Sequence, residues 1–160
     1  MTPIGASAEE RLLRLFPAAS PRQRSNMIRY TPSCQGIVAN QLEGFFVGWY
    51  HPPTPEEHLR ILQASDVIAL AIDQEADRVI GFATAITDGV LSAYLPLLEV
   101  LPSYQGQGIG SALVRHVLDQ LGHLRMIDLT CDPDVQPFYA RLGLVPSTGM
   151  MMRNHKARIR

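Results

Sequence analysis

The stretch VLPSYQGQGIGSAL, at residues 100–113, connects a strand to a helix through three closely spaced glycines. The apolar run Tyr94–Leu101 has the length of a strand, and Pro102 ends it. Apolar residues at helical spacing follow over 109–121. Glycines leave backbone N–H groups uncovered at the start of that helix, where the free N–H groups and the helix dipole both favour an anion. The sequence therefore predicts a seat for a phosphate or pyrophosphate.

Other glycine loops fit this stretch less well. A dinucleotide-binding loop has the spacing Gly-x-Gly-x-x-Gly, whereas Gly106, Gly108 and Gly110 alternate with other residues. Asp128 does lie at a suitable distance downstream to bind a ribose, so the dinucleotide alternative stays open at this point. A nucleoside-triphosphate loop needs a lysine, and this loop has none. An inert turn is the last alternative, although three glycines carry an entropic cost that a plain connector rarely needs.

Two segments of the chain resemble signatures of the GCN5-related N-acetyltransferase (GNAT) family. The pattern Gln-x-x-Gly-x-Gly, which begins at Gln105 after a strand and a proline, is similar to the family's cofactor loop. The segment VQPFYARLGL at 135–144 is similar to a second signature, a Phe-Tyr pair on a short helix followed by glycine and an apolar residue. The resemblance spans residues 27–153. It implies an α/β fold with a central mixed β-sheet of six to seven strands, flanked by about four helices.

The resemblance also implies acetyl-CoA as the co-substrate. The glycine loop would hold its pyrophosphate, the strand before the loop would pair with the pantetheine amides, and the Val100 N–H would stabilise the oxyanion. Asp132 stands where the family often has asparagine, so it would add a negative charge beside a polyanionic cofactor. The residues assigned to the cofactor in this way are Leu98, Glu99, Val100, Gln105, Gly106, Gln107, Gly108, Ile109, Gly110, Ser111 and Asp132.

Three residues are candidates for the chemistry of transfer to a primary amine. The resemblance gives Tyr139 the role of general acid toward the departing thiolate, although helix aromatics such as Phe138 and Tyr139 more often pack in a core. Glu99 is the only charged residue in its strand. It is expected either to act as general base, to pair with the substrate ammonium, to form a structural ion pair, or to be partly solvated at the strand end. Tyr94 is a competing candidate for the base. Neither Cys34 nor Cys131 lies in a nucleophile motif, which favours direct transfer in a ternary complex.

The acceptor is expected to be a small-molecule or peptide amine that binds between the early helices and the strand ends. Glu43, Asp88 and Ser92 could hold its ammonium group, and Trp49 could provide a cation–π face. Each of these residues is more often a solvated or packing residue. An alternative from another class is a non-catalytic module that binds CoA as a sensor or as a partner of another protein.

Hydrophobic periodicity and turn residues predict the remaining elements. Strands are expected at 27–30, 66–72, 78–87 and 125–130, with one or two final strands in 144–153 that include the run Met150–Met152. Helices are expected after Thr31-Pro32 with Val38, Leu42, Phe45 and Phe46 on one face, from the capping box Thr54-Pro-Glu-Glu57 to about Ala64, and over about 134–142. Residues 1–26 are expected to be an appendage with a short helix, and 27–160 a single N-acetyltransferase domain.

Composition sets the remaining expectations. The 160 residues are 46% hydrophobic and 18% charged, with a formal net charge of −1, so nothing favours nucleic acid as a partner. The two cysteines lie far apart, and the histidines have no ligand spacing, so neither a disulfide nor a metal site is expected. No apolar run has membrane-spanning length, and no secretory signal is evident. A cytoplasmic protein, as a monomer or homodimer, is the expectation.

Overall fold

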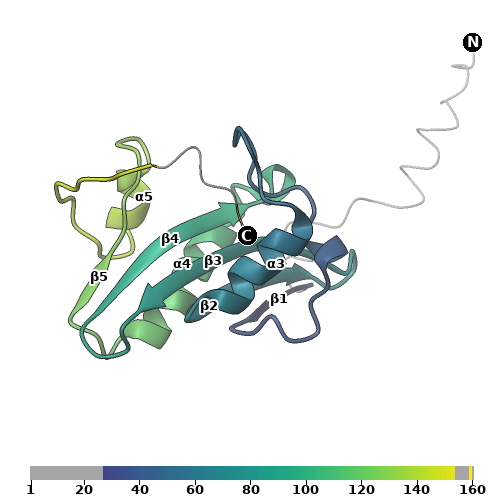
Figure 1. The fold of residues 1–160 in the computed structure, drawn as a ribbon, viewed down its shortest axis with the longest axis horizontal. Coiled ribbons are helices and arrows are strands. Elements are labelled where there is room, and N and C mark those ends of the chain that lie inside the picture. Colours follow the sequence, from purple (N-terminus) through teal and green to yellow (C-terminus); the bar gives the residue numbers. More distant parts are fainter. Residues whose placement is uncertain (1–26, 154–158, 160) are drawn as a thin grey trace, which may run out of the picture.

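A computed structural model describes residues 27–153 and residue 159, and Figure 1 shows its ribbon. The expected N-terminal appendage and its helix lie outside the described residues. The strands are β1 (Ile28–Thr31), β2 (Val67–Asp73), β3 (Arg78–Thr87), β4 (Ser92–Val100) and β5 (Met126–Asp128). The helices are α3 (Pro55–Ala64), α4 (Ile109–Leu121) and α5 (Gln136–Ala140), with short 3-10 turns η1 (Ala39–Leu42) and η2 (Pro102–Tyr104).

The strands form one mixed sheet in the order β1-β2-β3-β4-β5. The first four strands pair antiparallel with their neighbours, and β5 runs parallel to β4. The β4–β5 pairing covers only Ser92 to Tyr94 on β4, opposite Met126 to Asp128. Beyond Tyr94 the two strands separate, and β4 has no partner on that side among the described residues.

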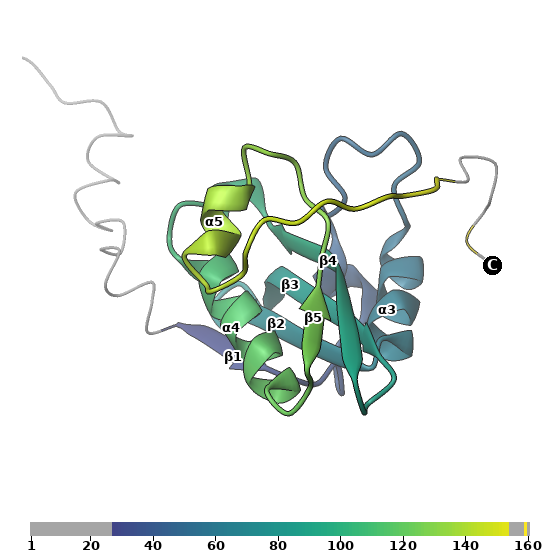
Figure 2. The ribbon, with the colours of Figure 1, turned by 90° about the vertical axis from the view of Figure 1, so that its left-hand side faces the viewer.

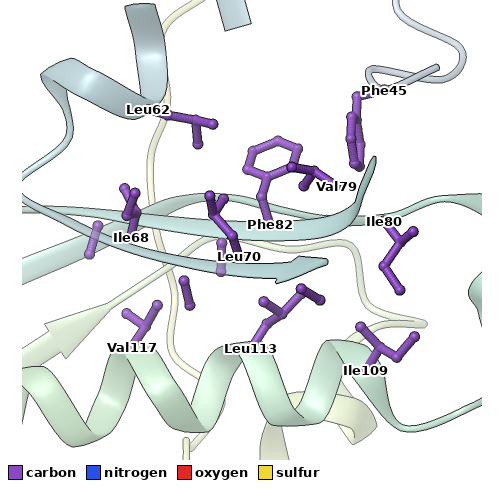
Figure 3. Packing of buried hydrophobic residues seen from close by; sticks show 14 of the residues in the cluster. Phe45, Leu62, Ile68, Leu70, Val79, Ile80, Phe82, Ile109, Leu113 and Val117 are labelled. Carbon is purple, nitrogen blue, oxygen red and sulfur yellow. The ribbon is translucent and has the colours of Figure 1, made fainter. Parts of the chain in front are cut away.

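Helices cover both faces of the sheet. The α4 side chains Ile109, Leu113 and Val117 lie against one face, while Leu62 of α3 and Phe45 lie on the other (Figure 3). The short α5 packs beside the start of α4, on the same face (Figure 2). Each apolar face is thereby removed from water, which is the main favourable contribution to folding.

Helix α3 begins and ends where the capping box predicts. The Thr54 hydroxyl accepts a hydrogen bond from the Glu57 N–H at 3.2 Å, and the Glu57 carboxylate accepts one from the Thr54 N–H at 2.8 Å. Pro55 occupies the first helical position, where its missing N–H is not needed. The hairpin of β2 and β3 also lies within a residue of its predicted bounds.

The prediction of a helix after Thr31-Pro32 is wrong. This region forms loops and the four-residue turn η1, because three of its glycines adopt the left-handed conformation that a helix cannot continue through. They are Gly36, Gly44 and Gly48. Leu42, Phe45 and Phe46 nevertheless reach the core, whereas Val38 stays exposed. The apolar pattern identified buried residues here but assigned them to the wrong backbone conformation.

The strands predicted in 144–153 are also absent from the described residues. This segment is extended but pairs with no strand, as it runs across the end of the sheet at β5 (Figure 2). Met150, Met151 and Met152 are correspondingly exposed. An apolar run forms a strand only where another strand offers its free N–H and C=O groups. The described part of the chain therefore has a five-stranded sheet and three α-helices, fewer than the six to seven strands and about four helices expected.

Within the described residues, no helix is both long enough and apolar enough to span a lipid bilayer.

Candidate active site

The glycine loop presents free backbone N–H groups at the start of α4. Gly108 is the N-cap residue with φ +81°, and Gly106 has φ +74°, so both adopt conformations that favour glycine. Nothing in the described structure lies within 4 Å of a Cβ built at either position. No backbone N–H from Gly106 to Ser111 donates a hydrogen bond to a described residue, and no side chain caps the helix. These free N–H groups at the start of a helix favour a bound anion.

A cavity of about 320 Å³ opens over this loop. Its wall includes the loop glycines, Val100 of β4, and two residues of the α5 segment, Phe138 and Arg141. The Phe138 ring would lie 3.7 Å from a Cβ at Gly110, so α5 contacts the start of α4 directly. Arg141 adds a cationic residue to the cavity that the free N–H groups face. Sequence analysis missed Arg141, because only the packing of α5 on α4 brings it to the loop.

The edge of β4 beside this cavity is open. The Leu101 N–H donates to the Ile80 carbonyl of β3 at 2.9 Å. Backbone N–H groups of successive strand residues point to opposite sides, so the N–H groups of Val100 and Leu98 face away from β3, toward the side that β5 has left. The Gln105 side-chain amide donates to the Val100 carbonyl at 2.9 Å and ties the loop to the strand.

A larger cavity, of about 910 Å³, lies between β5, α5 and residues 142–151, and Tyr94 is the β4 residue in its wall. Tyr94, Thr130, Cys131 and Tyr139 share its wall, so the structure brings the two candidate phenols together. The Tyr94 and Thr130 hydroxyls are 2.7 Å apart and hydrogen-bonded. Burial, with a smaller contribution from Cys131, raises the pKa of Tyr139 above its usual value near 10.0, so its phenol stays protonated at neutral pH. Thr130 is a second residue that sequence analysis missed.

Glu99 lies on the opposite face of β4 from Val100. Its carboxylate oxygens accept hydrogen bonds from the Phe46 N–H at 2.8 Å and the Val47 N–H at 3.1 Å. The described residues give it no ion pair, so the structural ion pair, one of the alternatives for Glu99, is not found; two backbone hydrogen bonds hold the carboxylate instead.

The four predicted acceptor residues fall into two separate places. Asp88 lies in the turn before β4, and Ser92 is the first residue of that strand. The Asp88 carboxylate accepts hydrogen bonds from the Val90, Leu91 and Ser92 N–H groups, which lower the pKa of Asp88 to about 2, Leu91 most strongly. Glu43 and Trp49 lie in the loop that Glu99 holds. The roles of all four in acceptor binding remain predictions.

The remaining predicted cofactor residues differ in how they could act. Ile109 is buried, so only its backbone N–H is available to a ligand. Asp132 is exposed, and its carbonyl accepts a hydrogen bond from the Val135 N–H at 3.0 Å in the turn that precedes α5. Within the described part of the chain, no group of three or more His, Cys, Asp or Glu residues could hold a metal ion.

Comparison with known proteins assigns this chain to a family. The profile of the acetyltransferase (GNAT) family matches residues 35–144, and the chain belongs to this family. More particularly, it is an N-acetyltransferase similar to the ycf52 proteins. It is 29% identical to the uncharacterized N-acetyltransferase ycf52 of Pyropia yezoensis over 121 residues, 72% of this chain and 70% of that protein. The resemblance seen in the two sequence signatures is confirmed, and the dinucleotide alternative is withdrawn.

Two further relatives bear on the site. A crystal structure of a protein from Deinococcus radiodurans R1 superimposes with a TM-score of 0.80 at 43% identity, and the match covers 88% of this chain and 95% of that one. The chain is also 36% identical to serotonin N-acetyltransferase 2, chloroplastic, of Oryza sativa subsp. japonica, over 69% of this chain and 58% of that protein. The name of the rice protein places that relative in the chloroplast; the cytoplasmic location expected here remains a prediction.

Proposed function

We propose that this N-acetyltransferase transfers the acetyl group of acetyl-CoA directly to a primary amine while both substrates are bound. The observation that carries the proposal is the run of free N–H groups from Gly106 to Ser111, which faces the 320 Å³ cavity. An anion bound there would be stabilised by those N–H groups and by the dipole of α4. Arg141 would add a charge-assisted contact to a diphosphate.

The open edge of β4 supports the path of the pantetheine arm. The N–H groups of Leu98 and Val100 face the side left by β5, and an amide-bearing arm could pair with them as a strand would. A thioester carbonyl beside Val100 would find one preorganised N–H donor, and removal of such a donor typically costs about 2.7–4 kcal/mol in the transition state.

Tyr139 would act at the departing sulfur. The amine nitrogen attacks the thioester carbon, the C–S bond breaks, and the phenol proton passes to the thiolate. A phenol with a raised pKa is fully protonated at neutral pH and therefore available as the acid. The amine loses a proton in the same reaction, and the hydrogen-bonded pair of Tyr94 and Thr130, in the wall of the same cavity, is the candidate to receive and relay it.

The name of one relative suggests a class of acceptor. The rice relative is named for serotonin, an aromatic primary amine, and this supports serotonin and related arylalkylamines as the first acceptors to try on this chain. Peptide N-termini and aliphatic amines form the rest of the panel.

The test is release of CoA thiol from acetyl-CoA in the presence of that amine panel. Wild type should consume the thioester only when an accepted amine is present. Gly110→Asp should abolish protection by acetyl-CoA against thermal unfolding, because it adds a negative charge to the cavity wall beside Phe138 and Val100 and would repel the diphosphate. An acid in the first turn leaves the helix itself stable. Gly110→Ala is the matched control, since a Cβ there meets only ordinary contacts. Binding of acetyl-CoA unaffected by Gly110→Asp would contradict the proposed seat.

A further inference from the structure

The Glu99 carboxylate occupies an anion-binding concavity made by one loop. Consecutive N–H groups of Phe46 and Val47 converge on its two oxygens at 2.8 and 3.1 Å. Phe46 has φ +60°, a left-handed conformation that few non-glycine residues adopt. Successive N–H groups in such a turn form a nest for a negative charge. The strained turn and the carboxylate therefore stabilise each other.

What this contact holds in place is the aromatic loop, defined as residues 43–50. The Phe46 ring is buried against His58, with ring centres 4.9 Å apart, and anchors the loop from inside. Trp49 is fixed to the same residue: its backbone N–H donates to the Phe46 carbonyl at 3.1 Å, and the centre of its ring lies 5.2 Å from that of the Phe46 ring. Trp49 is nevertheless 55% exposed, and the neighbouring Tyr50 is 91% exposed. The loop thus holds the Trp49 ring against Phe46 but leaves about half of that ring exposed.

Glu99 stands between Leu98 and Val100, the two residues whose N–H groups face the open edge of β4. The same strand segment that would align the thioester is therefore bonded to the aromatic loop. We propose, on the basis of the function proposed above, that Glu99 is a positioning residue: it fixes the aromatic loop to β4 so that Trp49 forms a wall of the acceptor site. The acceptor is then a primary amine with an aromatic or other apolar body that packs on the indole.

The contacts of Glu99 oppose its role as general base. A base takes up a proton in each turnover, and a protonated carboxyl group exchanges an acceptor site for an O–H donor. Protonation also removes the negative charge that strengthens the bonds to the Phe46 and Val47 N–H groups, so the hold on the loop would weaken in every cycle. A carboxylate that stays ionised throughout keeps both hydrogen bonds.

Glu99→Gln tests the assignment with little change in volume. The amide can accept only one of the two N–H groups, so the loop should loosen. We expect the KM for an aromatic amine to rise about tenfold, as for the loss of a hydrogen bond to a charged group. The KM for acetyl-CoA and the shape of the pH profile of kcat should stay as in wild type. Asp77→Asn is the matched control, because Asp77 holds the Gln41 side chain on η1, outside the aromatic loop, at 3.0 Å.

Trp49 provides a second readout, because it is the only tryptophan of the chain. Its fluorescence emission should shift in Glu99→Gln but not in Asp77→Asn, and an aromatic amine should change it in wild type. A fall in kcat of a hundredfold or more, with loss of the acidic limb of the pH profile and an unchanged amine KM, would make Glu99 the base and overturn the proposal. Unchanged emission and unchanged KM would overturn it as well.

Failure of the proposed acetyl transfer can be distinguished from failure of the role proposed for Glu99. If wild type consumes no acetyl-CoA with any amine, the transfer reaction fails, while the Trp49 emission of Glu99→Gln still reports whether the carboxylate fixes the loop. Trp49→Ala completes the set: it should raise the KM of an aromatic amine more than that of an aliphatic one. Equal effects on the two amines would refute the indole as the selecting wall.

Discussion

Replacement of Tyr139 by phenylalanine should separate catalysis from folding and from cofactor binding. The described residues give the Tyr139 hydroxyl no hydrogen bond, and its ring is half-buried in the wall of the larger cavity. Loss of the hydroxyl should therefore change the free energy of unfolding by no more than about 0.5 kcal/mol. Loss of a general acid should lower kcat about 10²- to 10⁴-fold, which corresponds to about 2.7–5.4 kcal/mol in the barrier.

The assay is thiol release under saturating acetyl-CoA and amine, with a thermal melt in parallel. Acetyl-CoA should raise the melting temperature of Tyr139→Phe as much as that of wild type. Because burial raises the pKa of Tyr139, kcat of wild type should also show no alkaline loss from this phenol below about pH 10. Tyr94→Phe is the companion variant, since it removes the other phenol and its bond to Thr130. A Tyr139→Phe enzyme within fivefold of wild-type kcat would refute the acid role.

Three further predictions concern stability. Gly108→Ala should destabilise the protein by about 1–2 kcal/mol, because Gly108 has a φ of +81°. Gly110→Ala, inside α4, should stabilise it by up to about 1 kcal/mol. Chemical denaturation of the two variants distinguishes these opposite changes in the free energy of unfolding. Burial lowers the pKa of His58 to about 4, against a smaller opposite effect of the Leu42 backbone, so between pH 6.5 and 4 the unfolded chain binds a proton that the folded chain does not. As the pH is lowered from 6.5 to 4, the free energy of unfolding should then fall by up to about 3 kcal/mol. A His58→Met variant should lose this pH dependence. Phe82→Ala, at the fully buried centre of the core, should cost about 3–5 kcal/mol in urea unfolding, and a loss under 1 kcal/mol would contradict the packing.

Local signals in the sequence located the elements that depend on neighbouring residues. The capping box at Thr54 and Glu57 fixed the start of α3, because both of its hydrogen bonds lie within one turn. The glycine loop was predicted for the same reason: a strand, a turn and a helix start are all encoded within residues 94–121.

Features that depend on distant residues could not be predicted. Glu99 was recognised as an isolated charge, but its partners Phe46 and Val47 lie more than fifty positions away and bind through backbone N–H groups, which no side-chain pattern reveals. The same holds for Arg141, which approaches the glycine loop only through packing of α5. The segment 144–153 was predicted as strand from its apolar residues, although the pattern carries no information on whether a neighbouring strand is present.

The short seam between β4 and β5 has a consequence for the unliganded protein. Among the described residues after α4, those up to 153 are attached to the sheet by three residue pairs, by hydrogen bonds from the Arg125 and Met126 N–H groups to the Leu91 carbonyl, and by the contact between the Tyr94 and Thr130 hydroxyls. A ligand that binds where β4 and β5 separate would contact both strands and stabilise this short pairing. When acetyl-CoA binds there, amide hydrogen exchange in 122–144 should slow far more than exchange in β2 and β3. Bound co-substrate would thus supply much of the rigidity of this region.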